Sequence, residues 1–249
     1  MMMTALLAAA MSVAPAAICT AQETQTTQPQ QTAEKSSRSE WLPEFSEVKV
    51  EAAIDIRFVQ VSDSEAPRIV YDTKGETETK FKATVDKHGV LTITERIQRD
   101  SRSKTVVEVY YHTLTSLDVS DAYVTFGQRV GQKMMKIEIG GGGKITAEMD
   151  VTDLEIGLSG KNTRAKFTGR ARYVEIAASG GVVDASAMES MSVEATASYG
   201  ASVTVRATER LKTSASTSAT ITYRGAPSIV KGRTAVLGGT VRSVNESED

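Results

Sequence analysis

LEIGLSG at residues 154–160 and VEIAASG at residues 174–180 are the clearest copies of a short pattern that recurs along the middle of the chain. Looser copies begin at Leu117, Met135, Met191 and Leu211, so that successive copies start 17 to 20 residues apart. Each copy reads as an alternating strand, a turn of small residues and a second alternating strand. A fixed period near ~20 residues is typical of a solenoid, in which each unit buries its apolar side only against its neighbours.

Alternate positions of the first strand are expected to point into the solenoid, because side chains alternate between the two faces of a strand. The first position holds Leu117, Met135, Leu154, Val174, Met191 and Leu211, and the third holds Val119, Ile137, Ile156, Ile176, Val193 and Thr213. The second position holds Asp118, Lys136, Glu155, Glu175, Ser192 and Lys212, which belong in water. The fifth position holds Asp121, Ile139, Leu158, Ala178, Ala195 and Ala215, so the core should narrow toward the C-terminus. Asp121 breaks this column and indicates an irregular or differently registered first turn.

Small residues follow each first strand, and a short second strand follows them. Glycine tolerates positive φ and serine can bond nearby backbone, so a tight corner is expected at sites such as Ser159-Gly160 and Ser179-Gly180. The second strands are expected at residues 144–147, 164–167, 182–185, 202–205 and 220–223. Two strands and a corner in ~20 residues leave no room for a crossover helix, which predicts an all-β parallel β-helix. An antiparallel meander or propeller stays open as the alternative, since Ser-Gly also suits a hairpin.

The strongly alternating residues 41–112 carry no repeat and are expected to form a β-rich cap over the first coil of a solenoid at residues 113–242. Asp86-Lys-His-Gly89 is a turn signal between residues 81–85 and 90–94, which predicts a hairpin. A cap is needed because the first coil would otherwise expose a strand edge. Residues 243–249 are expected to form a polar tail.

Composition agrees with a thin core and gives no reason to expect nucleic acid as a partner. Hydrophobic residues make up 40% of the 249 residues and aromatic residues only 5%, as suits a narrow stack of Ile, Val, Leu and Ala. The formal net charge is −2 and no basic patch stands out, so nucleic acid is not expected as a dedicated partner.

The N-terminal segment predicts export. Residues 1–21 carry no charged side chain and include an apolar run at residues 5–11, which is too short to span a membrane. This pattern favours a signal peptide cleaved after Ala21, although the usual basic start is missing. A lipid anchor on Cys19, the sole cysteine, is disfavoured because a bulky Ile18 precedes it. Residues 22–40 are polar and aperiodic and are expected to form a disordered tether. No other segment is long and apolar enough to span a membrane.

The chain resembles the autotransporter adhesin head GIN domain family of exported bacterial proteins over roughly residues 45–240. The resemblance is carried by FSEVKV at residues 45–50, GVLTI at 89–93, the Ser-Gly turns at 159–160 and 179–180, and ITYRGAP at 221–227. It implies a β-helical solenoid in the periplasm or on the outer-membrane or cell surface, and it brings no catalytic residues. The copies at Leu117, Met191 and Leu211 depart from the family pattern by lacking Ser-Gly.

No catalytic, cofactor-binding or metal-binding site residues are predicted. The two histidines, His88 and His112, show no metal-binding spacing, and no Gly-x-Ser-x-Gly motif occurs. Most serines sit at repeat corners. Gly140-Gly-Gly-Gly143 precedes a strand rather than the helix that a phosphate cradle needs, so it is interpreted as a corner.

The candidate functional residues are therefore surface side chains of the repeats. The carboxylates are Asp118, Glu138, Glu155, Glu175 and Glu194, with Lys136 and Arg172 as candidate cations, and Tyr123, Tyr173, Tyr199 and Tyr223 are candidate platforms for a sugar ring. Glu155 and Glu175 should be neighbours on adjacent coils. The leading hypothesis is a non-enzymatic envelope protein, adhesin-like or a scaffold, whose repeat surface binds a glycan or a protein and which needs no cofactor. The alternatives are a carbohydrate-active enzyme that uses these carboxylates and a purely structural periplasmic protein without a ligand.

Overall fold

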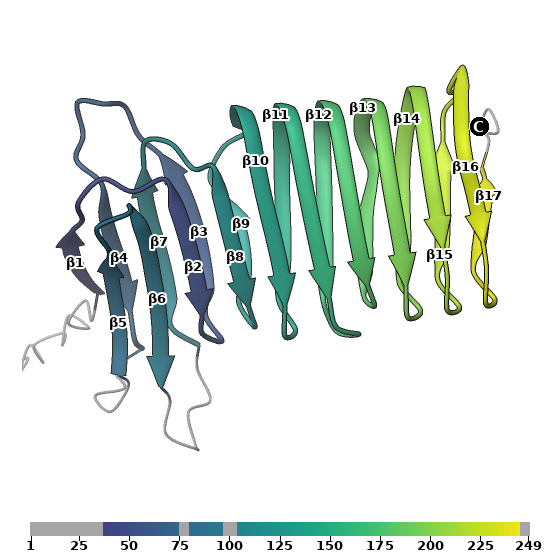
Figure 1. The fold of residues 1–249 in the computed structure, drawn as a ribbon. Coiled ribbons are helices and arrows are strands. Elements are labelled where there is room, and N and C mark those ends of the chain that lie inside the picture. The colour runs from purple at the N-terminus through teal and green to yellow at the C-terminus, as the bar shows by residue number, and fades with distance from the viewer. Residues whose placement is uncertain (1–36, 75–79, 97–103, 245–249) are drawn as a thin grey trace, which may run out of the picture. The chain divides into compact units, whose positions relative to one another are not determined.

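In the computed structural model, which describes residues 37–74, 80–96 and 104–244, the chain winds into a stack of parallel coils (Figure 1). The described residues contain strands and no helix. Successive copies pair in parallel, for example Leu154 with Val174 and Ile156 with Ile176. The predicted parallel β-helix is therefore confirmed, and an antiparallel meander is excluded for the repeats.

The regular coils are made by long strands that bend once. These are β10 (Val130–Gly140), β11 (Lys144–Ser159), β12 (Arg164–Ser179), β13 (Val182–Ser198) and β14 (Ser202–Ala215). In β11 to β14 the first half lies in one long face of the stack, face B, and the second half lies in the other, face A. Each long strand bends where the alternation of buried and exposed side chains is interrupted. In β11 the buried Val151 and Leu154 are separated by two residues that are not buried.

Shorter strands complete the two faces. Face A also contains β8 (Ser116–Ser120) and β16 (Ile229–Ala235), and face B also contains β9 (Tyr123–Phe126), β15 (Thr220–Arg224) and β17 (Thr240–Ser243). Each pairs in parallel with the neighbouring long strand. The tight turns that join face A to face B lie along the lower edge of the stack in Figure 1, and the bends lie along its upper edge.

The N-terminal region continues the solenoid in a spatial order that differs from the chain order. Its strands are β2 (Glu47–Glu51), β3 (Asp55–Gln60), β6 (Val90–Arg96) and β7 (Val106–Tyr111). β2 pairs in parallel with both β6 and β8, and β3 pairs in parallel with both β7 and β9. The coil made of β2 and β3 is therefore stacked between the coil made of β6 and β7 and the coil made of β8 and β9, although it comes first in the chain. The boundary predicted at residues 112 and 113 is thus not a boundary of the solenoid.

Antiparallel strands cover the N-terminal end of the stack. They are β1 (Ser37–Trp41), β4 (Arg68–Asp72) and β5 (Lys80–Val85). β4 pairs with β7, β1 pairs with β4, and β5 pairs with β6, so the expected hairpin around Asp86–Gly89 is present. They satisfy the strand edges that the outermost coil would otherwise expose. Residues 37–40, predicted as tether, belong to β1, because their backbone pairs with β4.

Two copies of the repeat are registered differently from the alignment of the sequence. Leu117 pairs with Ile137 rather than Met135, and Val193 rather than Met191 pairs with Val174 and Leu211. The first copy reaches its corner early, and Asp121 lies exposed in the turn instead of in the core. Since the side-chain period of a strand is two, a shift by two residues keeps every side chain on its face. Met191 is the exception, because it lies on the bend and is exposed.

The corrected inward columns form the core. They are Met135, Leu154, Val174, Val193 and Leu211; Leu117, Ile137, Ile156, Ile176, Ala195 and Thr213; and Val119, Ile139, Leu158, Ala178, Ala197 and Ala215. All of these side chains are buried. The third column shrinks from Ile139 to Ala215, as the sequence predicts.

The corners adopt left-handed backbone. Gly160 and Gly180 have φ of 93° and 84°, which explains the Ser-Gly turns. Thr217 and Ser218 also have positive φ, and the Ala219 N–H donates to the Ser216 carbonyl at 3.0 Å, which makes a two-residue turn of type I′. The copies that lack Ser-Gly therefore keep a left-handed corner and build it from other residues.

Candidate functional site

A groove follows the bends of the coils. One wall is the outward row Met134, Asp153, Tyr173, Ser192 and Arg210, and the other is the outward row Lys136, Glu155, Glu175, Glu194 and Lys212. The two rows flank the buried column that starts at Met135, because the residues before and after an inward side chain both point outward in a strand. Residues of one row repeat at the ~4.8 Å spacing of adjacent strands.

The groove spans several coils. Its central part has a volume of about 420 Å³ and extends from Met134 to Glu194. A second part of about 340 Å³ shares Ser192 and Glu194 with the first and continues to Ile229 and Lys231. A third hollow of about 580 Å³ shares Met134 and reaches Gln60. A ligand that lies along the solenoid axis could contact several of these parts at once.

The charges in the groove form a ladder. Lys136 Nζ lies 2.6 Å from Glu155 Oε1 and 3.3 Å from Glu138 Oε1, and Lys212 Nζ lies 2.5 Å from Glu194 Oε1. The hydrogen bond to Glu155, followed by that to Glu138, raises the pKa of Lys136 above its ordinary value. Glu175, between Glu155 and Glu194, has no ion-pair partner among the described residues. Asp153, on the opposite wall, has no ion-pair partner among the described residues either, so the centre of the groove holds two carboxylates that are available to a ligand.

Apolar and aromatic surface lies beside this carboxylate. Tyr173 is 43% exposed and Met134 is 63% exposed, although both are large side chains. The Arg172 guanidinium carbon lies 5.3 Å from the centre of the Tyr173 ring. A ring presented next to carboxylate and hydroxyl groups suits a ligand that has both apolar and polar faces.

The sequence-derived candidates are distributed over several places. Glu155 and Glu175 are register neighbours, as predicted, and Glu194 rather than the expected Ser192 continues their row. Asp118 and Glu138 pair side by side in the next outward column of face A. The tyrosines do not form one strip, because Tyr123 starts β9 in face B, Tyr199 lies in a corner turn and Tyr223 is buried. Sequence reasoning missed Met134, Asp153 and Arg210, which the failure of alternation just before each buried column could have indicated.

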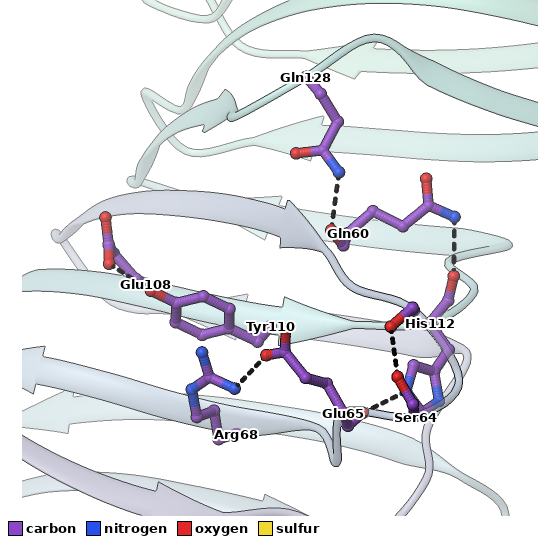
Figure 2. A network of polar contacts seen from close by, with 9 residues as sticks. Gln60, Ser64, Glu65, Arg68, Glu108, Tyr110, His112 and Gln128 are labelled. Atoms are coloured by element: carbon purple, nitrogen blue, oxygen red, sulfur yellow. Dashed lines mark hydrogen bonds and ion pairs between the residues drawn. The ribbon is translucent and has the colours of Figure 1, made fainter.

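His112 belongs to a polar network at the N-terminal coils (Figure 2). Its Nδ1 lies 3.1 Å from Glu44 Oε2, and its Nε2 lies 2.6 Å from the Glu65 carbonyl oxygen. The Gln60 amide donates to the His112 carbonyl, and the Gln128 amide donates to the Gln60 carbonyl. This network ties the connection between β7 and β8 to neighbouring loops.

The remaining sequence-derived candidates lie in turns and corners of the fold. His88 lies exposed in the turn that starts at Asp86, and Gly140–Gly143 closes a corner in which the Gly143 N–H donates to the Gly140 carbonyl at 2.9 Å. In residues 37–74, 80–96 and 104–244, no three His, Cys, Asp or Glu side chains are grouped to hold a metal ion. The same ranges contain no helix able to cross a membrane. Cys19, the predicted cleavage site at Ala21 and most of the predicted tether lie outside the described residues.

Comparisons with known proteins give one family and a shared fold. Residues 44–227 match the family described as "Putative auto-transporter adhesin, head GIN domain". The chain is similar to the crystal structure of a putative adhesin from Bacteroides fragilis, with 18% identity over 84% of this chain and 96% of that chain and a TM-score of 0.74. A putative adhesin and a putative lipid binding protein, both from Parabacteroides distasonis, have 20% and 16% identity and TM-scores of 0.61 and 0.59, with the same coverage. No curated protein matches the chain.

Proposed function

The chain belongs to the head GIN domain family, and from this premise we propose that it is an exported, adhesin-like protein of the cell envelope that binds an extended glycan in its groove without catalysing a reaction. The observation that carries the proposal is the exposed Tyr173 ring beside the unpaired Glu175 in a groove that crosses several coils. Sugar rings stack on aromatic rings through their apolar faces, while carboxylates and lysines bond their hydroxyl groups.

The backbone of the groove favours a glycan over a peptide. The strands that form its floor lie inside the stack, and each pairs with a strand on both sides. A peptide that binds by adding a strand needs an exposed sheet edge, which the middle of the groove does not offer. A glycan needs only side chains, and those side chains repeat along the groove at every coil.

A glycan array probed with the protein tests this proposal. We expect an extended glycan to bind, and we expect Tyr173→Ala to weaken binding at least about tenfold, or about 1.4 kcal/mol. Tyr199→Ala is the matched control, because Tyr199 is 68% exposed in a corner turn outside the groove, and it should leave binding unchanged.

Three results would contradict the proposal. They are the absence of any glycan ligand, equal effects of Tyr173→Ala and Tyr199→Ala, and turnover of the bound glycan that Glu175→Gln abolishes. The last result would instead support the carbohydrate-active enzyme.

The export part of the proposal is supported by residues 1–21, which combine an apolar run with the absence of charge. N-terminal sequencing of the protein purified from cells that produce it tests this part. We expect the mature chain to begin at Gln22. A chain that begins at an acylated Cys19 would show a lipid anchor instead, and a chain that retains Met1 would contradict export by this route.

A further inference from the structure

The groove changes the sign of its charge along the solenoid axis. Its central part is lined by four carboxylates and one cation, namely Asp153, Glu155, Glu175, Glu194 and Lys136. Its C-terminal part, where β14 and β16 are the last strands of face A (Figure 1), is lined by three cations and one carboxylate, namely Arg210, Lys212, Lys231 and Glu194. The formal net charge of −2 for the whole chain does not reveal this division.

Two of the three cations in the C-terminal part are available to a ligand. Lys212 is bonded to Glu194, whereas neither Arg210 nor Lys231 has an ion-pair partner among the described residues. Arg210 belongs to one wall of the groove, and Lys231 belongs to the other wall, one coil further on. Cations that line a hollow without a counter-charge attract an anionic group of a ligand.

The side chains at this end suit a carboxylate or a sulfate group. The planar guanidinium of Arg210 can donate two parallel hydrogen bonds to such a group, and the ammonium of Lys231 adds a point charge. The Ser192 hydroxyl lies on the same wall as Arg210 and can donate as well. Ile229, which is 41% exposed, offers apolar surface to the sugar ring that carries the group.

The acidic centre limits where the anionic group of a ligand can lie. Arg210 is two coils from Tyr173 and Lys231 is three coils from Glu175, so the cations lie about 10 to 14 Å along the axis from the aromatic ring. Like charges repel within the Debye length of about 8 Å at physiological salt, so a second anionic group beside Glu175 is opposed. A ligand that fits both parts therefore has its anionic group at one end and neutral sugars in the centre.

We infer that the C-terminal part of the groove is a subsite for one carboxylate or sulfate group at the end of the glycan, so that the glycan binds in one direction. This inference rests on the proposed function, because it takes the occupant of the groove to be a glycan. Arg210 and Lys231 bond the anionic group from the two walls, and neutral sugars extend from there to Tyr173. Asp153 and Glu175 accept hydrogen bonds from the hydroxyl groups of these sugars.

A glycan array with matched sets tests this inference. Each set contains a neutral glycan, the same glycan with one terminal uronate or one terminal sulfate, and a glycan of equal length with an acidic group on every sugar. We expect the singly acidic members to bind at least about tenfold more tightly than the neutral one, with an advantage that falls as salt rises. The uniformly acidic member should bind more weakly than the singly acidic ones, because the carboxylates of the centre repel it.

Variants of the groove separate the anion subsite from the aromatic ring. The double variant Arg210→Gln, Lys231→Gln should remove the preference, so that singly acidic and neutral members bind alike. Tyr173→Ala should instead weaken both members to the same extent and keep the preference. The double variant Lys144→Gln, Arg164→Gln is the matched control, because it removes two exposed cations of face B outside the groove and should keep the preference.

The possible results distinguish this inference from the proposed function. Glycan binding without a preference for the singly acidic members would overturn the inference and leave the proposed function intact. A preference that survives in Arg210→Gln, Lys231→Gln, or tightest binding by the uniformly acidic member, would overturn the inference as well. A preference for uronate alone or for sulfate alone would support it and identify the group. The absence of any glycan ligand would overturn both.

Discussion

Two buried threonines on the same solenoid differ in what their hydroxyl groups contact. Thr163 and Thr213 are both 0% exposed, but the Thr163 hydroxyl donates to the Ser159 carbonyl at 2.6 Å, whereas the Thr213 hydroxyl has no partner in the described part of the chain. A buried hydroxyl without a partner costs about 1–3 kcal/mol. We expect Thr213→Val to raise the free energy of unfolding by about 1–2 kcal/mol and Thr163→Val to lower it by about 1 kcal/mol, as measured by urea unfolding. Equal effects of the two changes would contradict this account.

Thr217 shows the cost of a corner built without glycine. Its φ is 49°, a left-handed value that a β-branched residue adopts at a cost of about 1–2 kcal/mol. Asparagine tolerates this conformation, so Thr217→Asn should raise the free energy of unfolding by about 0.5–1 kcal/mol. Thr220→Asn is the control, because Thr220 lies in β15 and asparagine is disfavoured in strands. Stabilisation by Thr220→Asn as well would argue against backbone strain as the cause.

At the scale of the strand, the sequence predicts which side chains point inward better than which ones pair. Alternation places Ile156 and Ile176 in the core correctly, and the neighbours Glu155 and Glu175 follow from the same period. Alternation cannot distinguish a register from one shifted by two residues, so Leu117 and Met191 were aligned with the wrong partners. The groove depends on the bends, where alternation fails, and for that reason Met134 and Asp153 were not predicted.

The connection from β7 to β8 should make stability depend on pH. Hydrogen bonding to the Glu65 carbonyl, followed by that to Glu44 and the charges of Glu44 and Asp63, raises the pKa of His112 above its ordinary value of 6.5. Charged His112 therefore stabilises the folded state, and the contribution is fully present below about pH 6.5 and is lost as pH rises through the folded pKa. We expect the melting temperature to fall from pH 6 to pH 8.

His112→Gln should make the melting temperature less dependent on pH in this range, and His88→Gln, in an exposed turn, is the matched control. The carboxylates with lowered pKa, such as Asp150 beside Arg170, lose their contribution only at acid pH and do not overlap with this range. An unchanged pH profile in His112→Gln would contradict the assignment to this histidine.

Neighbouring coils should differ sharply in how much one inward side chain contributes to the free energy of unfolding. Leu211 and Val230 occupy the same column, yet Leu211 is enclosed and Val230 is open to solvent. Leu211→Ala should lower the free energy of unfolding by about 2–5 kcal/mol, because it removes buried apolar surface and leaves a cavity. Val230→Ala should cost less than about 0.5 kcal/mol, as is usual for exposed positions. Urea unfolding of both variants measures the difference, and similar losses would mean that the last coil is covered in solution.

At the scale of the whole stack, the order of the coils is the feature that the sequence does not reveal. Val48 and Val50 follow the same alternation as Leu117 and Val119, and the structure pairs these strands directly. The chain between them leaves the stack, builds β4 and β5, and then returns to add β6 and β7 on the side of β2 and β3 that faces away from the repeats. This excursion breaks the ~20-residue period, so a search for repeats finds none before residue 117. Each strand before that residue nevertheless follows the same alternation of inward and outward side chains.

The two ends of the stack should open with different ease. Stability in a solenoid is close to a sum over coils and their interfaces, so a coil with one neighbour opens more readily than a coil with two. Antiparallel strands cover the N-terminal end, whereas β16 and β17 have neighbours on one side only among the described residues. Hydrogen exchange followed by mass spectrometry should therefore show protection that is highest in β11 to β13 and falls toward β16. Backbone amides of β16 should exchange at least about 100-fold faster than those of β12, a difference of about 2.7 kcal/mol in opening free energy. Uniform protection from β7 to β17 would mean that the stack opens as one cooperative unit, and slow exchange in β16 alone would show that something in solution already covers the edge.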